Sequence, residues 1–184
     1  MKAKTLTVLI TACAAMPAFA GDLDLSLTNH SARAQVNAMD SRSPINVGAG
    51  YTYHTGSRNI FNLDFHAQGR TALGNLPATA GLGVRGLYFN DNGVKGGGIG
   101  IGGFTTVNIP QVPGLSVGGA IHYAPNVLSF DAANHIWDFD GRVSYRVIRN
   151  GEVYAGYRYV SYEPEHGDNR VLDNGLMAGM KLYF

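Results

Sequence analysis

Apolar and polar side chains alternate along most of this chain with a period of two residues. In the last stretch, 176–184, one set of alternate positions is apolar and ends on Phe184, whereas the other set is small or polar. Side chains of a β-strand point alternately to its two faces, so the pattern predicts a strand with one apolar face. The alternation recurs in segments of about ten residues separated by turn residues, which is typical of a transmembrane β-barrel.

The alternating segments predict an all-β protein, a single antiparallel up-and-down transmembrane β-barrel. Both termini of such a barrel lie on the periplasmic side, so the strand number is even. A turn at Asn29-His30-Ser31 divides the first region in two and gives ten strands, which we favour, while merging or discarding a weak strand gives eight. The ten predicted strands cover 23–27, 32–38, 45–54, 61–68, 82–88, 94–107, 116–123, 137–146, 153–159 and 176–184.

The connections between these strands carry turn residues. Hairpin turns are predicted at 90–93 and 149–151, and longer loops at 108–114, 125–134 and 163–174. The strand over 94–107 places Gly96, Gly98, Gly100 and Gly102 on one face. A glycine row of this kind allows a strand to bend or another group to approach it closely. No helix start follows the row, so it does not fit a phosphate-binding loop.

The first twenty residues read as a signal peptide. Lys2 and Lys4 precede an apolar run, and Ala18-Phe19-Ala20 forms a small-x-small cleavage site. The predicted domains are therefore a signal peptide over 1–20 and a barrel over 21–184. A lipoprotein cleavage box that leaves Cys13 acylated is the less favoured alternative. Cleavage after Ala20 removes the only cysteine, so no disulfide contributes to the fold.

Composition narrows the classes of function. Without Lys2 and Lys4, the 14 Lys and Arg residues nearly balance the 13 Asp and Glu residues, which argues against a nucleic-acid partner. No later apolar run reaches the length of a transmembrane helix. The 25 glycines and 10 tyrosines fit twisted strands better than helices.

Short motifs resemble a known family. The segments Tyr123-Ala124-Pro125, Leu128-Ser129 and Gly156-Tyr157-Arg158-Tyr159, together with the terminal Phe184, resemble the YfaZ family of outer-membrane proteins. The resemblance implies a monomeric barrel in the bacterial outer membrane. Its partners would be the lipid bilayer and the barrel-assembly machinery, which would recognise the C-terminal strand ending on Phe184. The family carries no catalytic residues that could be transferred.

If the aromatic faces meet lipid, the opposite faces turn charged groups of both signs toward the lumen. Buried charges are tolerated when they are paired, so we expect an ion-pair and hydrogen-bond network that fills the interior. The predicted members are Asp64, His66, Arg85, His122, Asp138, Asp140, Arg142, Arg146, Arg158 and Lys181.

The interpretation that follows is a largely plugged barrel with a structural role or an interaction role through its extracellular loops. A narrow pore for ions or very small solutes is the alternative. A lipid-modifying enzyme is less favoured, as is a soluble periplasmic ligand-binding barrel. The last would place Tyr51, Phe61 and Trp137 inside instead of against lipid.

No catalytic, cofactor or metal site is predicted. The segment 122–126 resembles a His-x-Ser-Asn element, but Ala124 stands where the nucleophile would be, so His122 has no hydroxyl to activate. His135, Asp138 and Ser144 have the residue types of a triad, yet six residues along one strand separate the last two by about 20 Å. The six histidines lack metal-ligand spacing.

One loop holds residue types that could bind a cation weakly. Glu163, Glu165, His166 and Asp168 lie close together within the predicted loop 163–174. A solvated polar surface loop is the favoured interpretation.

Overall fold

The structure, a computed structural model, describes residues 21–38, 44–164 and 167–184. The predicted signal peptide and Cys13 lie outside the described residues. The elements are β1 (Asp22–Thr28), β2 (Ser31–Asn37), β3 (Ile45–His54), β4 (Arg58–Leu73), β5 (Leu76–Asp91), β6 (Val94–Asn108), β7 (Leu115–Ala124), the 3₁₀ turn η1 (Asn126–Leu128), β8 (Ser129–Asp131), β9 (His135–Ile148), β10 (Gly151–Glu163) and β11 (Arg170–Tyr183).

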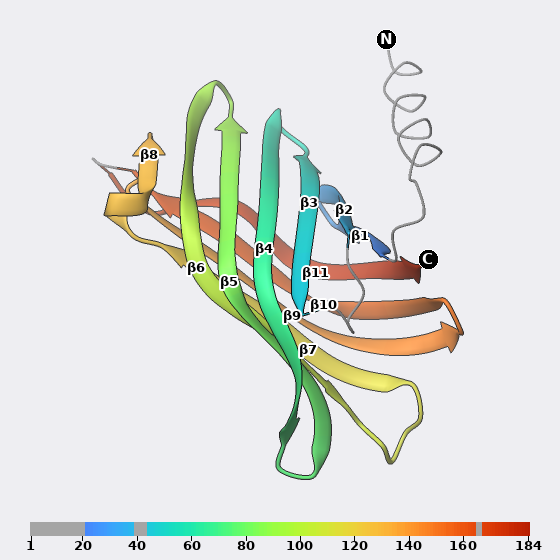
Figure 1. Cartoon of the computed structure of the whole chain (residues 1–184). Helices are drawn as coiled ribbons and strands as arrows, with labels where there is room; N and C mark the ends of the chain where they lie inside the picture. Colours follow the sequence, from blue (N-terminus) through green and yellow to red (C-terminus); the bar gives the residue numbers. More distant parts are fainter. Residues whose placement is uncertain (1–20, 39–43, 165–166) are drawn as a thin grey trace.

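These strands form one closed antiparallel sheet (Figure 1). Each long strand pairs with its neighbour in the chain, and β1 pairs with β11 to close the ring. Within the described residues, ten strands make the ring, and the short β8 pairs only with β6, outside it. The all-β fold and the ten-stranded barrel predicted from the sequence are confirmed. The chain also turns between β1 and β2 where the sequence predicted it.

The closing seam joins the two ends of the described chain. Asp22 pairs with Tyr183 and Thr28 with Met177, so the whole of β1 lies along β11. Gly21 and Phe184 extend the ladder, with Gly21 N donating to the Phe184 carbonyl at 2.9 Å and Phe184 N donating to the Gly21 carbonyl at 3.0 Å. β11 is therefore paired as far as Phe184, and Gly21 and Phe184 lie side by side.

We call the end of the barrel where β1 begins and β11 ends the terminus end, and the opposite end the loop end. Asn92 and Gly93 turn the β5–β6 hairpin at the loop end with φ values of 52° and 94°, the left-handed geometry that an Asn-Gly pair adopts readily. The segment 125–134 joins β7 to β9 there and folds back to place β8 on β6.

The prediction of a loop over 163–174 was wrong in its bounds. β10 continues to Glu163 and β11 already begins at Arg170. Leu172 and Asp173 are buried, with 0% and 1% of their surfaces exposed, so burial and pairing hold this segment in the sheet. A register shift between Val160 and Ser161 hides the strand from a simple period-two reading. Glu165 and His166 of the predicted loop lie outside the described residues.

The two faces of the barrel are inverted relative to a water-soluble protein. Tyr51, Phe61 and Trp137 are 44%, 44% and 46% exposed on the outer face. Their neighbours in sequence, such as Thr52 and Asn62, are buried in the lumen. No helix among the described residues is long and apolar enough to cross a membrane. The outer surface is thus a band of large apolar side chains, as the alternation predicted.

The inner face of β6 carries no large side chains along much of its length. A methyl group at Gly98 would lie 3.1 Å from both Ala124 Cβ and Ile136 Cδ1, closer than packed atoms normally approach. At Gly100 the same test gives 3.2 Å to His122 Cβ. Side chains from neighbouring strands therefore occupy the space beside β6, which agrees with the crowding predicted for the glycine row.

Candidate functional site

The lumen contains three successive regions between the loop end and the terminus end. Buried apolar side chains fill the first, buried ion pairs form the second, and a polar cavity makes the third. The strand pairings place the members of each region at similar heights around the ring. The interior is therefore asymmetric along the barrel axis.

The apolar region, here called the apolar plug, is a cluster of buried side chains inside the loop end. Phe89 and Tyr162 form its centre, with ring centroids 4.4 Å apart and with 0% and 1% of their surfaces exposed. The members of the apolar plug are Ile60, Leu87, Phe89, Ala124, Ala133, Ile136, Val160, Tyr162 and Leu172. Sequence reasoning missed this cluster, although its strand residues other than Leu172 lie on the inner face by the same period of two.

Arg85 organises the ion-pair region below the apolar plug. Its Nε donates to Asp64 Oδ1 at 2.6 Å and its Nη2 to Asp64 Oδ2 at 3.2 Å, a two-pronged contact between paired strands. Its Nη1 donates to Asp138 Oδ2 at 2.7 Å on β9. The Arg85 side chain reaches β9 past Gly100, its partner on β6, which has no side chain to block it. One guanidinium thus pairs with two buried carboxylates from different strands.

Two histidines meet beside this ion pair. His66 Nε2 and His122 Nε2 are 2.7 Å apart, and both residues are buried. The ring of Phe104 packs edge-on against His66, with centroids 5.5 Å apart. The contact is a hydrogen bond in which one ring donates and the other accepts. No group of three or more His, Cys, Asp or Glu among the described residues is arranged to hold a metal ion.

Arg158 forms a second buried contact, closer to β11. Its Nη1 lies 3.9 Å from Asp173 Oδ2, and its Nη2 donates to Ser26 Oγ at 3.3 Å. Asp173 also accepts a hydrogen bond of 3.0 Å from Ser31 Oγ. Arg158 and Asp173 are 4% and 1% exposed, so this pair is isolated from water and ties β10 and β11 to β1 and β2.

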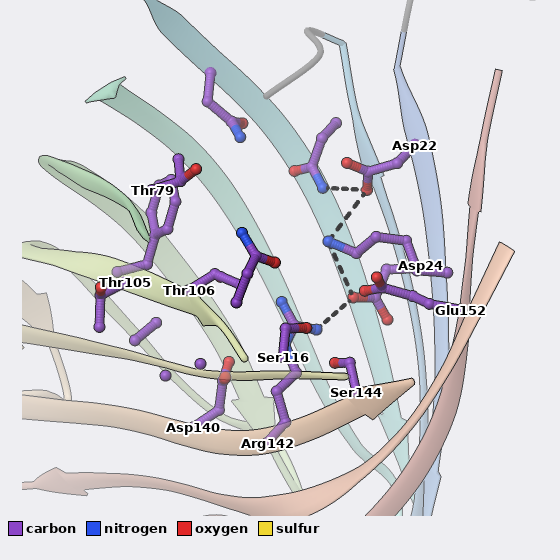
Figure 2. Close-up of a pocket in the computed structure, with 18 of the residues that line it drawn as sticks. Asp22, Asp24, Thr79, Thr105, Thr106, Ser116, Asp140, Arg142, Ser144 and Glu152 are labelled. Atoms are coloured by element: carbon purple, nitrogen blue, oxygen red, sulfur yellow. Dashed lines mark hydrogen bonds and ion pairs between the residues drawn. The ribbon is translucent and has the colours of Figure 1, made fainter. Parts of the chain in front are cut away.

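A chain of ion pairs runs along the wall of the lumen toward the terminus end (Figure 2). Arg142 Nη1 donates to Asp24 Oδ2 at 2.8 Å. Lys181 Nζ lies 3.7 Å from Asp22 Oδ1 and 3.9 Å from Asp24 Oδ2. The Tyr154 hydroxyl donates to Asp24 Oδ1, and Arg142 lies over the Tyr154 ring at 5.0 Å. The pairs link β1, β9, β10 and β11.

The third region is a cavity of about 560 Å³ in the half of the barrel nearest the terminus end. Its inner end is formed by His66, Arg85 and His122, and its outer end by residues near the turns, including Asn108 and Tyr183. A separate void of about 10 Å³ lies beyond Arg85, against Leu87 and Ile136 of the apolar plug. That is about the space for one water molecule.

The structure brings most of the predicted lumen residues together. Asp64, Arg85 and Asp138 form one group, His66 and His122 another, and Asp140 is buried on β9 opposite Arg158 on β10. Arg142, Arg158 and Lys181 pair with carboxylates that were absent from the prediction. Arg146 differs, because it is exposed and lies over the Tyr183 ring at 5.7 Å.

The missed polar partners were Asp22, Asp24, Arg33 and Asp173. The first three alternate with apolar residues at the start of the mature chain, so the period of two could have placed them in the lumen. Asp173 continues the inward positions Met177 and Gly175 of β11 in the same register, but the loop predicted over 163–174 left it out of the strand.

His135, Asp138 and Ser144, which have the residue types of a catalytic triad, do not form a hydrogen-bonded relay in the structure. The Tyr123 hydroxyl lies 2.9 Å from His135 Nδ1, and the two rings stack. Asp138 points into the lumen and pairs with Arg85. His122, beside Ala124, contacts His66 and not a hydroxyl.

The chain matches a known protein family and is similar to solved outer-membrane proteins. The family model described as YfaZ precursor matches residues 1–184. Among solved structures, the chain is similar to the outer membrane channel DcaP of Acinetobacter baumannii, with a TM-score of 0.44 and 10% identity over 88% of this chain and 54% of that chain. It therefore spans about half the length of DcaP.

Two further structures are similar over nearly their whole length. A KdgM porin in complex with disordered oligogalacturonate gives a TM-score of 0.46 and 10% identity over 90% of this chain and 99% of that chain. The outer membrane protein Omp33 of Acinetobacter baumannii gives 0.38 and 12%, over 90% and 96%. The comparison with curated proteins gives no match.

Proposed function

Because the chain belongs to the YfaZ family and is an outer-membrane β-barrel, we propose that it acts as a sealed barrel, with a structural role or an interaction role at its loop end. The observation that carries this proposal is the apolar plug. Phe89, Tyr162 and Leu172 are at most 1% exposed inside the loop end, where a conducting pore would need a wetted path.

Barrel size supports the same proposal. Barrels of about eight strands are filled by their own side chains, whereas water-filled porins use about sixteen. Ten strands leave a lumen that the apolar plug and the ion-pair region fill at mid-height and above. Ions crossing this barrel would have to displace the apolar plug.

Orientation and assembly complete the proposal. β1 begins and β11 ends at the same end of the barrel. This terminus end faces the periplasm, and the loop end faces the outside. The strand β11 would present Phe184 to the barrel-assembly machinery, and the ring closes without a second copy of the chain, as a monomer would. The loop segments 125–134 and 167–169 would then carry any contact with external partners.

Single-channel recording in a planar lipid bilayer tests the sealed barrel. We expect no steady conductance steps from the purified protein. The double variant Phe89→Ala and Tyr162→Ala empties the centre of the apolar plug and should produce steps, whereas Phe61→Ala on the lipid face should not. Steady steps from the unaltered protein would reject the proposal.

A narrow pore is the second candidate, and one observation favours it. The cavity penetrates from the terminus end to Arg85, and a void of about 10 Å³ continues on the other side of that residue. Displacement of the Arg85 side chain and of the apolar plug would then connect the two ends. The same recording decides between the candidates, because a pore predicts small steps before any side chain is removed.

A further inference from the structure

The cavity at the terminus end has the size of a small-molecule site. Its volume of about 560 Å³ falls within the range of about 300–1,000 Å³ common to such sites. If the barrel is sealed as proposed, the cavity is a cup with one entrance, and a solute that enters from the periplasmic side must leave the same way. This inference rests on the proposed function and adds an occupant to it.

Most charged groups lining the cup already have partners. Arg142 pairs with Asp24, Lys181 lies between Asp22 and Asp24, and Arg85 is held by carboxylates. A charged ligand would have to compete with these contacts and would gain little from a wall whose charges cancel. The cup therefore does not select a strongly charged solute.

Two cations that line the cup have no ion pair among the described residues and could argue otherwise. Arg146 lies at the outer end over the Tyr183 ring. The other is Arg33. Its Nη2 donates to the Gln35 side-chain oxygen, which engages part of the guanidinium. Its Nε has no hydrogen-bond partner among the described residues, but this atom is buried and does not open onto the cup. An anionic ligand is consequently the competing occupant, and the experiment below includes it.

The opposite wall offers neutral hydrogen-bonding groups. Thr79 of β5, Thr106 and Asn108 of β6 and Ser116 of β7 line the cup, and none of these side chains bonds another side chain in the described part of the chain. Figure 2 shows the threonines on the side of the cavity away from Asp22. Hydroxyl and amide groups both donate and accept, so they match a ligand rich in hydroxyls.

An aromatic ring completes this wall. Phe104 lines the cup, and its ring covers the backbone of Gly81, where any Cβ would overlap it. Because Phe104 lines the cup, part of its ring is turned toward the cavity. The C–H face of a sugar ring packs against such an apolar surface while its hydroxyl groups reach the polar wall.

From these observations we infer that the cup binds an uncharged, hydroxyl-rich solute of the sugar class, entering from the terminus end. Thr106 and Asn108 would supply hydrogen bonds, and Phe104 would supply the stacking surface. The paired charges at the other wall would fix the depth to which the ligand enters.

Calorimetric titration of the detergent-solubilised barrel tests this inference. The probes are the neutral disaccharide trehalose, the sugar acid glucuronate and the amino sugar glucosamine. We expect saturable binding of trehalose that falls about tenfold in Phe104→Leu and in Thr106→Val, since one hydrogen bond or one stacking contact is worth about 1–1.5 kcal/mol. The matched control, Thr71→Val on the outer face of β4, should bind as the unaltered protein does.

The outcomes separate this inference from the proposed function. Absence of saturable trehalose binding, or preference for glucuronate or glucosamine, would overturn the inference and leave the sealed barrel standing. Conductance of the unaltered protein would instead overturn the sealed barrel, whatever the titration gives. Equal loss in Thr71→Val would show that the effect is not specific to the cup and would also overturn the inference.

Discussion

Replacing Arg85 with methionine should destabilise the barrel severely, because Arg85 forms ion pairs with two carboxylates inside the lumen. Its side chain is 7% exposed, and its nitrogens lie 2.6 Å from Asp64 and 2.7 Å from Asp138. Removing one partner of a buried ion pair typically costs about 3–5 kcal/mol, since the remaining charge is left in a poorly solvated place.

The two carboxylates would suffer unequally. Asp64 keeps hydrogen bonds from Gln35 Nε2 at 2.8 Å and Asn62 Nδ2 at 3.1 Å, which continue to stabilise its charge. Arg85 supplies the ion pair of Asp138 within the described structure. We therefore expect the free energy of unfolding to fall by about 4 kcal/mol, with most of the loss arising at Asp138.

Urea unfolding in lipid vesicles, followed by the fluorescence of Trp137, would measure this change. The sequence contains one tryptophan, so the signal reports on a single place. The control is Arg58→Met, whose side chain is 23% exposed. It removes an ion pair to Asp91 and hydrogen bonds to the carbonyls of Val171 and Leu172, and should cost about 2 kcal/mol, less than the loss at the fully buried Arg85. A second variant adds Asp64→Leu and Asp138→Leu to Arg85→Met.

The second variant tests the cause of the loss. When all three charges are replaced by apolar side chains, no unpaired charge remains, and stability should recover most of the loss. An Arg85→Met barrel that loses no more than the Arg58→Met control would refute the reasoning. So would a triple variant as unstable as the single one, because the loss would then come from packing and not from charge.

Three further outcomes follow from the same structure. Gly98→Val places a Cβ within 3.1 Å of side chains of the apolar plug and should lower the free energy of unfolding in urea by about 1–3 kcal/mol. In the control Gly69→Val, a Cβ meets nothing within 4 Å, so the free energy of unfolding should not change. Phe65→Lys places a charge on the lipid face, where Phe65 is 52% exposed, and should cost about 2–4 kcal/mol in vesicles but little in a soluble barrel. Phe184→Ser should lower the amount of folded barrel in outer-membrane fractions without slowing refolding in detergent. The control Phe130→Ser should leave that amount unchanged, and equal effects of the two variants would contradict an assembly role for Phe184.

The period of two in the sequence predicted the barrel and the side of each strand that faces lipid. The strand number needed the further rule that such barrels have an even number of strands, which favoured ten and left eight as the alternative. Tyr51 and Phe61 are exposed and their neighbours are buried because a strand has only two faces, and a barrel closes one of them. The same rule places Asp64 and Arg85 inside. Their pairing follows from the register of β4 on β5, which alternation alone does not set.

The parts that escaped prediction depend on contacts across the lumen. The Arg85 side chain on β5 contacts Asp138 on β9 past two intervening strands. His66 on β4 contacts His122 on β7. The start of β11 was hidden because one extra residue, Leu172, lies between Val171 and Asp173, and this bulge reverses the apparent faces of the residues that precede it. These contacts are set by barrel closure, which no local pattern encodes.

The glycine row of β6 explains why the lumen is divided as it is. A barrel of ten strands has room for only some of its inward side chains, and β6 supplies almost none at mid-height. Phe89 fills the space at Gly96, where a Cβ would lie 2.7 Å from its ring, and the apolar plug forms there. Lower down, Gly100 leaves the space that Arg85 crosses and His122 occupies. Larger inward side chains return only at Phe104 and Thr106, so the cup begins where the glycine row ends.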